Sequence, residues 1–477
     1  MNSIPIALTY DDVLIVPRRS GLNSRSEAVT TTRLTKKINL HIPLVSANMD
    51  TVTESQMAIA LARLGGIGIL HRFMTIEENI EEVKRVKRAQ NFVVRDPYSI
   101  DPNKTIGQAK EFIAKCGVTG LVVANDDGRL HGILSRRDMM FAENDHALVS
   151  EIMTPRAKLI VGVPSTTFEE AKNIFAQNKI EKLPLVDEDN KIIGLITSDD
   201  IRLRIDYPLA NTDEKGNLLV GASIGVKGDY IERAQELIKA GVDVLVIDIA
   251  HGHSDLMFDA IKNVRAACTD VQLIAGNIAT SGAAQELCEA GVDGLKVGVG
   301  PGTICITRLV TGCGVPQLSA VMNVAATAQK YNVPVIADGG IQKSGDIVKA
   351  IGAGADTVML GGSLAGTHES PGLIINRDGK KYKVCRGSAS FAIAERRQKV
   401  GQEKKEMNEV TPEGVEAVVP YKGYLAEIVG QFIGGLKSGM SYTNSRTIGE
   451  LQKNCDFVRI TNAGLRESGP HDLQDVR

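Results

Sequence analysis

Short apolar runs recur along the chain, and each ends on or beside a polar residue or a glycine. Three of them share one sequence pattern: a helix-like stretch ends at a glycine, a short loop follows, and an apolar strand comes after the loop. Stretches with helical periodicity, such as 229–240 and 281–290, separate many of the runs. Because crossovers between parallel strands carry helical material over the sheet, eight strands alternating with helices predict an α/β fold, the (β/α)8 TIM barrel. The eight segments are "IPLVSA" (42–47), "GIGIL" (66–70), "LLVGASI" (218–224), "KAGVDVLVID" (239–248), "VQLIAGN" (271–277), "EAGVDGLKVG" (289–298), "VPVIAD" (333–338) and "GAGADTVML" (352–360).

One interval breaks this spacing, because residues 71–217 are too many for a single loop. Inside it, "HGILSRRD" (131–138) and "IGLITSDD" (193–200) repeat one pattern. The pair resembles a tandem CBS-domain (Bateman) module inserted into the barrel. We therefore predict three segments: 1–90 as the first part of the barrel, 91–205 as the CBS regulatory module, and 206–477 as the remainder of the barrel with a mobile flap at 386–420.

Each repeat of this interval carries a hydroxyl residue after its strand and an aspartate at the start of the next helix, namely Ser135 with Asp138 and Thr197 with Asp200. This order resembles the way in which CBS modules hold adenosine or guanosine nucleotides, with the hydroxyl near a phosphate and the carboxylate on the ribose. The alternative is that Ser135 and Thr197 simply cap the helices that follow. The sequence leaves both interpretations open. Nucleotide binding here predicts regulation by purine nucleotides.

The composition adds few constraints. Against 57 acidic residues there are 55 basic ones, a net charge of −2 that gives no field to recruit nucleic acid or an anionic membrane. We expect no membrane span and no signal peptide, because no apolar run reaches the ~18 residues that a span needs and the start lacks a basic-then-apolar layout. Seven cysteines without C-x-x-C spacing predict free thiols, no structural zinc and a cytoplasmic location.

Polar and glycine residues gather at the carboxyl ends of the predicted strands, where barrels of this type place their active sites. Glycines after strands seven and eight, at 339–340 and 361–362, suit a phosphate held by backbone N–H groups. Asp338 is placed to accept hydrogen bonds from a ribose diol. Together these residues predict a bound nucleoside monophosphate.

A cysteine stands in the glycine-rich stretch "VGVGPGTICITRLVTG" (297–312). A thiolate of Cys305 held on this loop beside a purine could attack the electron-poor C2 carbon and form a covalent adduct. Thr307 could then activate a leaving group or hold a water. The alternative is a small buried hydrophobic residue, which is the usual state of a lone cysteine. The surrounding glycines favour the nucleophile at this position.

Longer motifs carry a family resemblance. The chain resembles the IMP dehydrogenase and GMP reductase family over its whole length, and this resemblance implies a barrel with a CBS pair inserted after the second strand. The motifs are "LTYDDVLIVP" (8–17), "SANMDTVTE" (46–54), "IDIAHGHS" (247–254), "GVGPGTICITR" (298–308), "ADGGI" (337–341), "RGSAS" (386–390) and "PYKG" (420–423).

The resemblance also implies roles for individual residues. Cys305 is the nucleophile, with Thr307 and Glu369 as its catalytic helpers. The nicotinamide cofactor lies beside Asp248, His253, Asn277, Gly298 and Gly300. Potassium binds carbonyls of Gly300, Gly302 and Cys305, completed by Glu467, Ser468 and Gly469 of a neighbouring subunit, which implies a homotetramer, possibly paired into an octamer. The substrate-binding set is Ser46, Thr303, Asp338, Gly339, Gly340, Gly361, Gly362, Ser363, Gly387, Ser388 and Glu413.

The flap favours one branch of this family. A dehydrogenase hydrolyses the adduct with water activated by an Arg-Tyr pair, but this chain has Gly401 and Gln402 at those positions. Arg396 or Arg397 could substitute by a register shift, although a solvated arginine is the expected state of both. Without a general base, hydrolysis should slow by ~10²–10⁴. We therefore predict an NADPH-dependent GMP reductase of purine salvage, with an NAD-dependent IMP dehydrogenase as the alternative and a catalytically dead nucleotide sensor as a lesser one.

Overall fold

A computed structural model describes residues 4–90, 92–95, 97–140, 142, 144–400 and 411–470. The chain divides into two compact units. The first comprises residues 1–89, 209–213 and 218–477, and the second comprises residues 90–208 and 214–217. The first unit therefore contains both ends of the sequence, and the second is an insertion within it.

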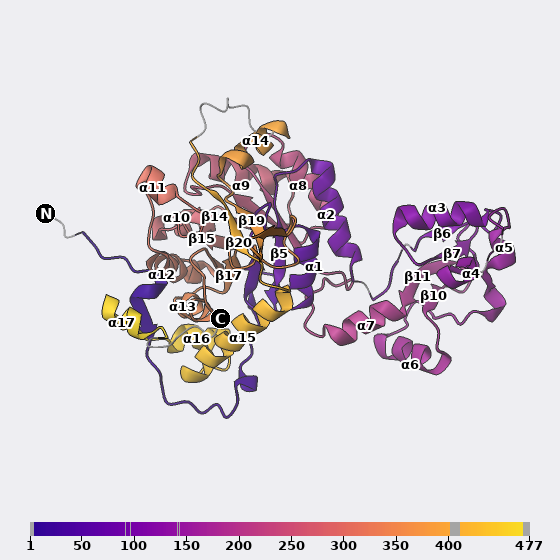
Figure 1. Cartoon of the computed structure of the whole chain (residues 1–477), viewed down its shortest axis with the longest axis horizontal. Helices are drawn as coiled ribbons and strands as arrows, with labels where there is room; N and C mark the ends of the chain where they lie inside the picture. The colour runs from indigo at the N-terminus through magenta and orange to yellow at the C-terminus, as the bar shows by residue number, and fades with distance from the viewer. Residues whose placement is uncertain are drawn as a thin grey trace. The chain divides into compact units, whose positions relative to one another are not determined.

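The first unit is a closed barrel of eight parallel strands, which confirms the predicted fold (Figure 1). Every strand corresponds to one of the eight apolar segments. Parallel pairing of the first strand with the last, Leu360 opposite Ser46, closes the ring. In spatial order the strands are β12 (Val220–Ile224), β13 (Val244–Asp248), β14 (Gln272–Ile278), β15 (Gly294–Val297), β16 (Val335–Asp338), β17 (Thr357–Leu360), β4 (Leu44–Ser46) and β5 (Ile67–Leu70).

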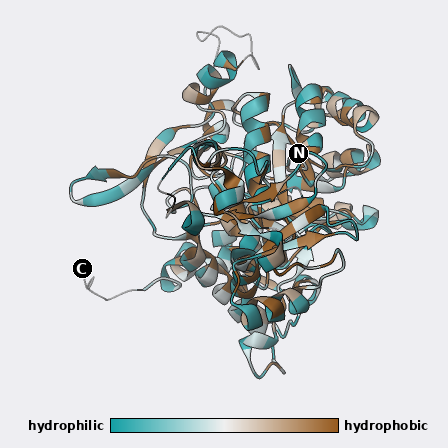
Figure 2. Ribbon diagram, turned by 90° about the vertical axis from the view of Figure 1, so that its right-hand side faces the viewer, coloured by the Kyte–Doolittle hydropathy of each residue, from teal (hydrophilic) through white to brown (hydrophobic). Residues whose placement is uncertain are grey.

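These strands are mostly apolar because both of their faces are buried. Along β13, Val244 and Val246 belong to a cluster inside the barrel, whereas Leu245 and Ile247 belong to the larger cluster between strands and helices. Side chains of a strand alternate between its two faces, so a strand covered on both sides needs no polar positions. Figure 2 shows this as continuous brown strands at the centre of the barrel, with teal concentrated on the surrounding helices.

Helices surround the barrel strands. The two helices predicted at 229–240 and 281–290 are confirmed as α8 (Tyr230–Lys239) and α10 (Ser281–Glu289). The others in this ring are α1 (Ser55–Arg63), α2 (Ile76–Arg88), α9 (Asp255–Ala267), α12 (Gln317–Ala328), α13 (Ser344–Gly352) and α15 (Leu425–Tyr442).

The first unit also contains smaller elements outside the barrel strands and their surrounding helices. The flap leaves on β19 (Lys380–Arg386), includes α14 (Phe391–Lys399) and returns on β20 (Glu416–Pro420), and these two strands form an antiparallel sheet with β18 (Ile375–Arg377). Near the termini, β1 (Val13–Ile15) pairs with β21 (Phe457–Arg459). The remaining elements are η1 (Tyr10–Asp12), η2 (Arg25–Glu27), β2 (Thr32–Arg33), β3 (Asn39–Leu40), α11 (Thr307–Thr311), η4 (Gln329–Tyr331), α16 (Ile448–Asn454) and α17 (Asn462–Glu467).

The second unit contains two similar hairpins. The first is β7 (Gly120–Ala124) with β8 (Leu130–Ser135), and the second is β10 (Lys182–Val186) with β11 (Ile192–Thr197). Both have a register shift at the same place, one residue before the first strand ends. The unit also contains β6 (Ser99–Ile100), α3 (Ile106–Cys116), α4 (Arg136–Met140), α5 (Val149–Ile152), β9 (Thr154–Pro155), η3 (Arg156–Lys158), α6 (Phe168–Asn178) and α7 (Ser198–Asp206).

The paired hydroxyl and carboxyl residues of this unit bond to each other. The Ser135 hydroxyl donates to the Asp138 carboxylate at 2.7 Å, and the Asp138 amide donates back to Ser135 at 3.3 Å. Thr197 and Asp200 repeat the arrangement at 2.6 and 3.2 Å. Both pairs thus cap the helices that follow them, as the simpler interpretation predicts.

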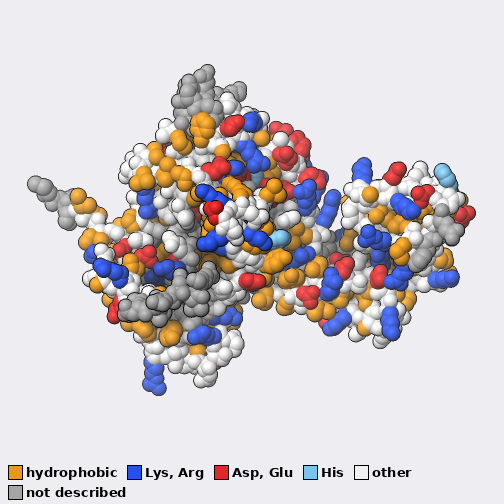
Figure 3. Space-filling model, viewed as in Figure 1, with side chains coloured by type: hydrophobic (Ala, Val, Ile, Leu, Met, Phe, Trp, Pro, Cys, Tyr) orange, Lys and Arg blue, Asp and Glu red, His pale blue; other side chains and the backbone are white. Residues whose placement is uncertain are grey.

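Charges of both signs are interspersed on the visible face of the molecule, where Figure 3 shows small groups of blue and red side chains between white and orange ones. Within the described part of the chain, no helix is both long enough and apolar enough to span a bilayer.

Candidate functional site

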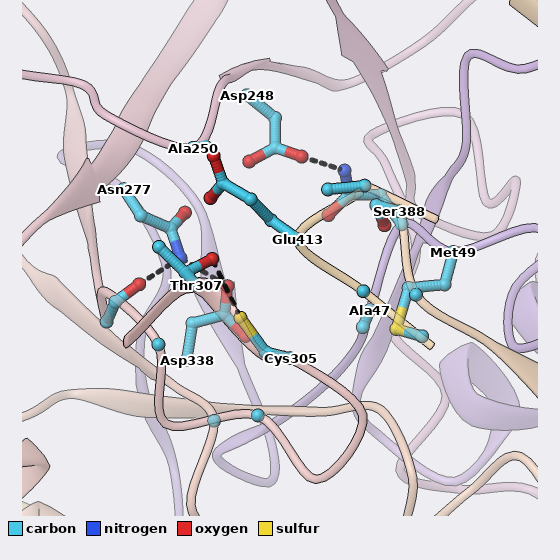
Figure 4. A pocket seen from close by; sticks show the side chains of 18 of the residues that line it. Ala47, Met49, Asp248, Ala250, Asn277, Cys305, Thr307, Asp338, Ser388 and Glu413 are labelled. Atoms are coloured by element: carbon cyan, nitrogen blue, oxygen red, sulfur yellow. Dashed lines mark hydrogen bonds between the residues drawn. The ribbon is translucent and has the colours of Figure 1, made fainter. Parts of the chain in front are cut away.

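A cavity of about 300 Å³ opens where the barrel strands end. Its walls come from the residues after β4, β5, β13, β14, β15 and β16 and from both arms of the flap (Figure 4). Among the residues with predicted roles, it is lined by Cys305, Thr307, Asp338, Gly339, Gly387, Ser388, Glu413, Asp248, Asn277, Gly298, Gly300 and Gly302. The sequence therefore identified a set of side chains that the fold brings together.

Cys305 lies on the loop between β15 and α11. Its sulfur is 3.1 Å from the hydroxyl oxygen of Thr307, the first residue of that helix. Gly298 lets the loop begin close to the next strand, because a Cβ there would lie 2.0 Å from the Asp338 carbonyl oxygen. Figure 4 shows the cysteine and threonine side chains pointing toward each other at the wall of the cavity.

The returning arm of the flap holds this loop in place. Ile306 donates its amide to the Glu413 carbonyl at 2.8 Å, and Val415 donates to Ile304 at 3.0 Å. Cys305 forms a β-bridge with Gly414 between these bonds. Glu413, a member of the predicted substrate-binding set, is consequently anchored by its own backbone beside Cys305.

A lysine that the sequence analysis did not single out lies at the base of the cavity. Lys296, on β15, is 2% exposed. Its ammonium is 2.9 Å from the Asp248 carboxylate and 2.7 Å from the Asp338 carboxylate, and it also bonds the Asn277 side chain. Asn48 donates to the other oxygen of Asp248 at 2.7 Å. One cation therefore joins the polar ends of β13, β14 and β16.

The charges of this cluster stabilise one another. Burial alone would lower the pKa of Lys296, but attraction by Asp248 and Asp338 outweighs it and the pKa is raised. Burial alone would raise the pKa of Asp248, but the ammonium and the hydrogen bond from Asn48 outweigh it and the pKa is lowered. Both partners are thus charged at neutral pH.

The glycine turns after β16 and β17 lie next to the cavity. Gly339 has a φ of +96°, a conformation that favours glycine, and a Cβ there would lie 2.8 Å from Pro301. Gly362 faces Thr303, since a Cβ on it would be 3.3 Å from the threonine hydroxyl oxygen. Thr303, Gly339, Gly340, Gly361, Gly362 and Ser363 belong to the predicted substrate-binding set, and we call them the phosphate cradle after the role proposed for them below. Of these six residues, Gly339 lines the cavity and the other five do not.

Six other residues with predicted roles do not line the cavity. The Glu369 carboxylate accepts the Leu425 amide at 2.9 Å, at the start of α15. Ser46 is fully buried and accepts a hydrogen bond from Thr53 at 2.8 Å. The His253 ring lies 3.2 Å from the Glu286 carboxylate. Glu467, Ser468 and Gly469 are at the end of α17 and the turn after it.

Two arginines line the cavity, and one of them, Arg397 of the flap, was expected to be solvated. Arg397 lines it, donates to the Ser388 carbonyl at 2.9 Å and stacks over the Phe73 ring at 5.0 Å. Arg72, which we had not considered, lines it too and lies over the same ring at 5.5 Å. Arg396 instead points to Asp50, 3.4 Å away. The predicted difference at Gly401 and Gln402 lies outside the described residues.

Comparison with known proteins agrees with this geometry. A family model described as "IMP dehydrogenase / GMP reductase domain" matches residues 7–471. The chain belongs to this family. It is 50% identical to a GMP reductase of Leishmania donovani, covering all of this chain and 99% of the relative. It is 48% identical to an inosine-5'-monophosphate dehydrogenase of Nitrosopumilus maritimus, covering 98% of both.

A solved structure shares the fold over the whole length. A cysteine-to-alanine variant of GMP reductase from Trypanosoma brucei, in complex with guanosine 5'-monophosphate, superposes with a TM-score of 0.93 at 47% identity and 99% coverage of both chains. The protein is thus an oxidoreductase of the IMP dehydrogenase and GMP reductase family. Relatives of both activities are similar to it at almost equal identity.

Proposed function

We propose that this protein is a GMP reductase, which converts GMP to IMP and ammonia with NADPH. The observation that carries the proposal is the 3.1 Å contact between the Cys305 sulfur and the Thr307 hydroxyl, inside a cavity formed by the barrel's strand ends. Substitution at the purine C2 carbon requires a nucleophile and a nearby group that can transfer a proton. The solved GMP reductase with bound GMP supports the same assignment.

In the proposed reaction the Cys305 thiolate forms a carbon–sulfur bond to C2 of GMP. The C2 amino nitrogen takes up a proton and leaves as ammonia, with Thr307 adjacent to relay that proton. We assign Glu369 to the same relay, behind Thr307, although in this structure its carboxylate accepts a hydrogen bond from the Leu425 amide and does not line the cavity. Deamination needs no activated water, so this route does not depend on an Arg-Tyr pair.

The cradle suits the phosphate of GMP. Its glycines leave backbone N–H groups accessible to a ligand, and Thr303 and Ser363 supply hydroxyl groups. Asp338, held by Lys296 and Asn277, is assigned to the ribose diol. Glu413, pinned beside the cysteine loop, is assigned to the N1 edge of the base, and Gly387 and Ser388 to the surrounding wall.

The residues around Asp248 fit a nicotinamide cofactor, which supplies a hydride when bound. Asp248 and Asn277 are fixed by Asn48 and Lys296, so their positions are set before any ligand arrives. A preorganised polar wall of this kind orients a ligand without further rearrangement. Choice of NADPH over NADH is part of the proposal.

An IMP dehydrogenase is the second candidate, and Arg397 favours it. This guanidinium lines the cavity from the flap, where a group that activates water would have to lie. The relative at 48% identity has that activity. Against it, no tyrosine occurs between Tyr382 and Tyr421 to complete an Arg-Tyr pair.

An absorbance assay separates the two candidates. Purified protein is given GMP with NADPH in one reaction and IMP with NAD in another, and both are followed at 340 nm, with ammonia measured in the first. The proposal predicts loss of absorbance and one ammonia released per NADPH oxidised. A response to IMP with NAD alone would overturn it.

Further parts of the proposal concern regulation and assembly. The second unit is proposed to be a CBS module that binds purine nucleotides through Ser135, Asp138, Thr197 and Asp200. Carbonyls of Gly300, Gly302 and Cys305 suit K⁺, a cation that protein carbonyls commonly coordinate. The described residues contain no cluster of three or more His, Cys, Asp or Glu side chains that could hold a metal instead. Residues 467–469 of a neighbouring subunit would complete this site in a tetramer.

A further inference from the structure

A lysine with no assigned role lies against the phosphate cradle. The Lys422 ammonium donates to the Ser363 carbonyl at 3.0 Å and to the Gly362 carbonyl at 3.4 Å. Both residues belong to the turn after β17. An ammonium has three N–H donors, so these two bonds leave a third for another acceptor. The argument that follows rests on the proposed nucleotide site.

The backbone of Lys422 is fixed relative to the cradle. Its amide donates to the Gly366 carbonyl at 2.8 Å, and His368 donates to the Gly423 carbonyl at 2.8 Å. Gly366 must lack a side chain here, because a Cβ would lie 2.2 Å from the Pro420 carbonyl oxygen. The segment that follows β20 is therefore locked against the turn that carries the cradle.

Lys422 is an exposed residue, with its ammonium partly covered by the turn to which it donates. Burial lowers its pKa against an opposing effect of Cys385, a fully buried residue. Two other cations of the first unit have partners of their own. Lys343 lies 3.6 Å from Asp11, and Arg308 donates to the Val299 and Val315 carbonyls within the cysteine loop.

We propose that the Lys422 ammonium pairs with the 5'-phosphate of the purine nucleotide in the cradle. Backbone N–H groups of glycine turns carry only partial charges, whereas the phosphate is a dianion at neutral pH. A lysine held by the same turn places a full positive charge beside them. Hydrogen bonds between charged groups are the stronger class, so this contact contributes to nucleotide affinity.

The test compares ligands that differ only in the phosphate. Equilibrium binding of GMP and guanosine is measured for the full-length protein and for Lys422→Met, Lys422→Arg and Lys381→Met. Lys381 is an exposed lysine on β19, in the same small sheet as β20, and serves as the matched control. We expect Lys422→Met to weaken GMP binding about 10- to 100-fold and leave guanosine binding unchanged. Lys422→Arg should retain most of the affinity, and Lys381→Met all of it.

The salt dependence of GMP binding gives a second readout that needs no measurable guanosine affinity. It should be steeper for the natural protein than for Lys422→Met, since screening acts on the charge pair. Equal losses for GMP and guanosine, or an unchanged GMP affinity in a folded Lys422→Met protein, would overturn the proposal. Repeating the comparison with IMP and inosine separates it from the question of reductase or dehydrogenase, because both substrates carry the same phosphate.

Discussion

The Lys296 ammonium lies 2.7 Å from the Asp338 carboxylate, and this buried pair links β15 to β16 beneath the proposed nucleotide site. A second carboxylate, Asp248, is 2.9 Å from the same nitrogen on its other side. The lysine therefore holds together the two aspartates that we assign to the ribose and to the cofactor. Function and stability depend on the same contact.

Replacement of Lys296 by methionine should destabilise the protein. The substitution leaves two largely buried carboxylates without their cation, and breaking a buried pair typically costs about 3–5 kcal/mol. Urea denaturation measures the free energy of unfolding. Lys239→Met is the control, because Lys239 is an exposed lysine that pairs with Glu236 on the surface of α8. A loss no larger than that of the control would contradict the role assigned to Lys296.

Replacement of Cys305 by alanine should abolish turnover while GMP binding persists. Loss of a covalent nucleophile lowers kcat by more than about 10⁴-fold. Cys313→Ala, at an exposed cysteine eight residues later in the sequence, should leave kcat unchanged. Steady-state rates and equilibrium binding of GMP are measured for both. Turnover near the natural rate in Cys305→Ala would contradict the covalent mechanism. If neither the natural protein nor Cys313→Ala turned over, a nucleotide sensor would be favoured instead.

Thr307→Val should slow the reaction without weakening substrate binding. Valine keeps the shape of threonine but removes the hydroxyl that lies 3.1 Å from the cysteine sulfur. Proton transfer by a positioned group typically contributes about 10²–10⁴-fold, so kcat should fall within that range and KM for GMP should change little. Thr311→Val, one turn later on α11, is the matched control. A KM effect with normal kcat would assign Thr307 to binding instead.

The buried carboxyl of Asp356 should make stability fall as pH rises. Burial raises its pKa to about 6, against hydrogen bonding from Val335 and attraction by Arg33. The folded protein then holds this proton more tightly than the unfolded chain does, so the associated stability is complete below about pH 4 and lost as pH rises through about 6. The loss is about 3 kcal/mol.

Asp356→Asn isolates this effect. The difference in unfolding free energy between the natural protein and the variant, measured by urea denaturation from pH 4 to 7, should shift in favour of the variant as pH rises. A difference that does not depend on pH would show that Asp356 ionises normally in the fold.

The barrel and much of its cavity were predictable because the signals are local. Each strand is a short apolar run, and the residues that follow it meet at one end of the barrel. Cys305, Asp338 and Glu413 were found in this way or by resemblance. Lys296 was missed, although a single lysine within the buried strand "GLKV" was the available signal, since a charge there requires a buried partner.

Features that depend on how distant segments pack could not be predicted. Arg397 was expected to be solvated, because the sequence of a short, highly charged helix does not show which of its faces is buried. In the structure the Arg397 guanidinium lies over the Phe73 ring. Glu369 was placed in the proton relay by resemblance. Its carboxylate meets the Leu425 amide because α15 begins there, a contact across 56 residues of sequence that no local pattern reveals.

Intact-protein mass spectrometry of acid-quenched turnover with GMP and NADPH tests the central claim most directly. The account predicts a fraction of protein that gains the mass of GMP less ammonia, located by peptide mapping on Cys305 and missing from Cys305→Ala. Turnover of GMP with no such species at any quench time, or the added mass on another residue, would contradict it.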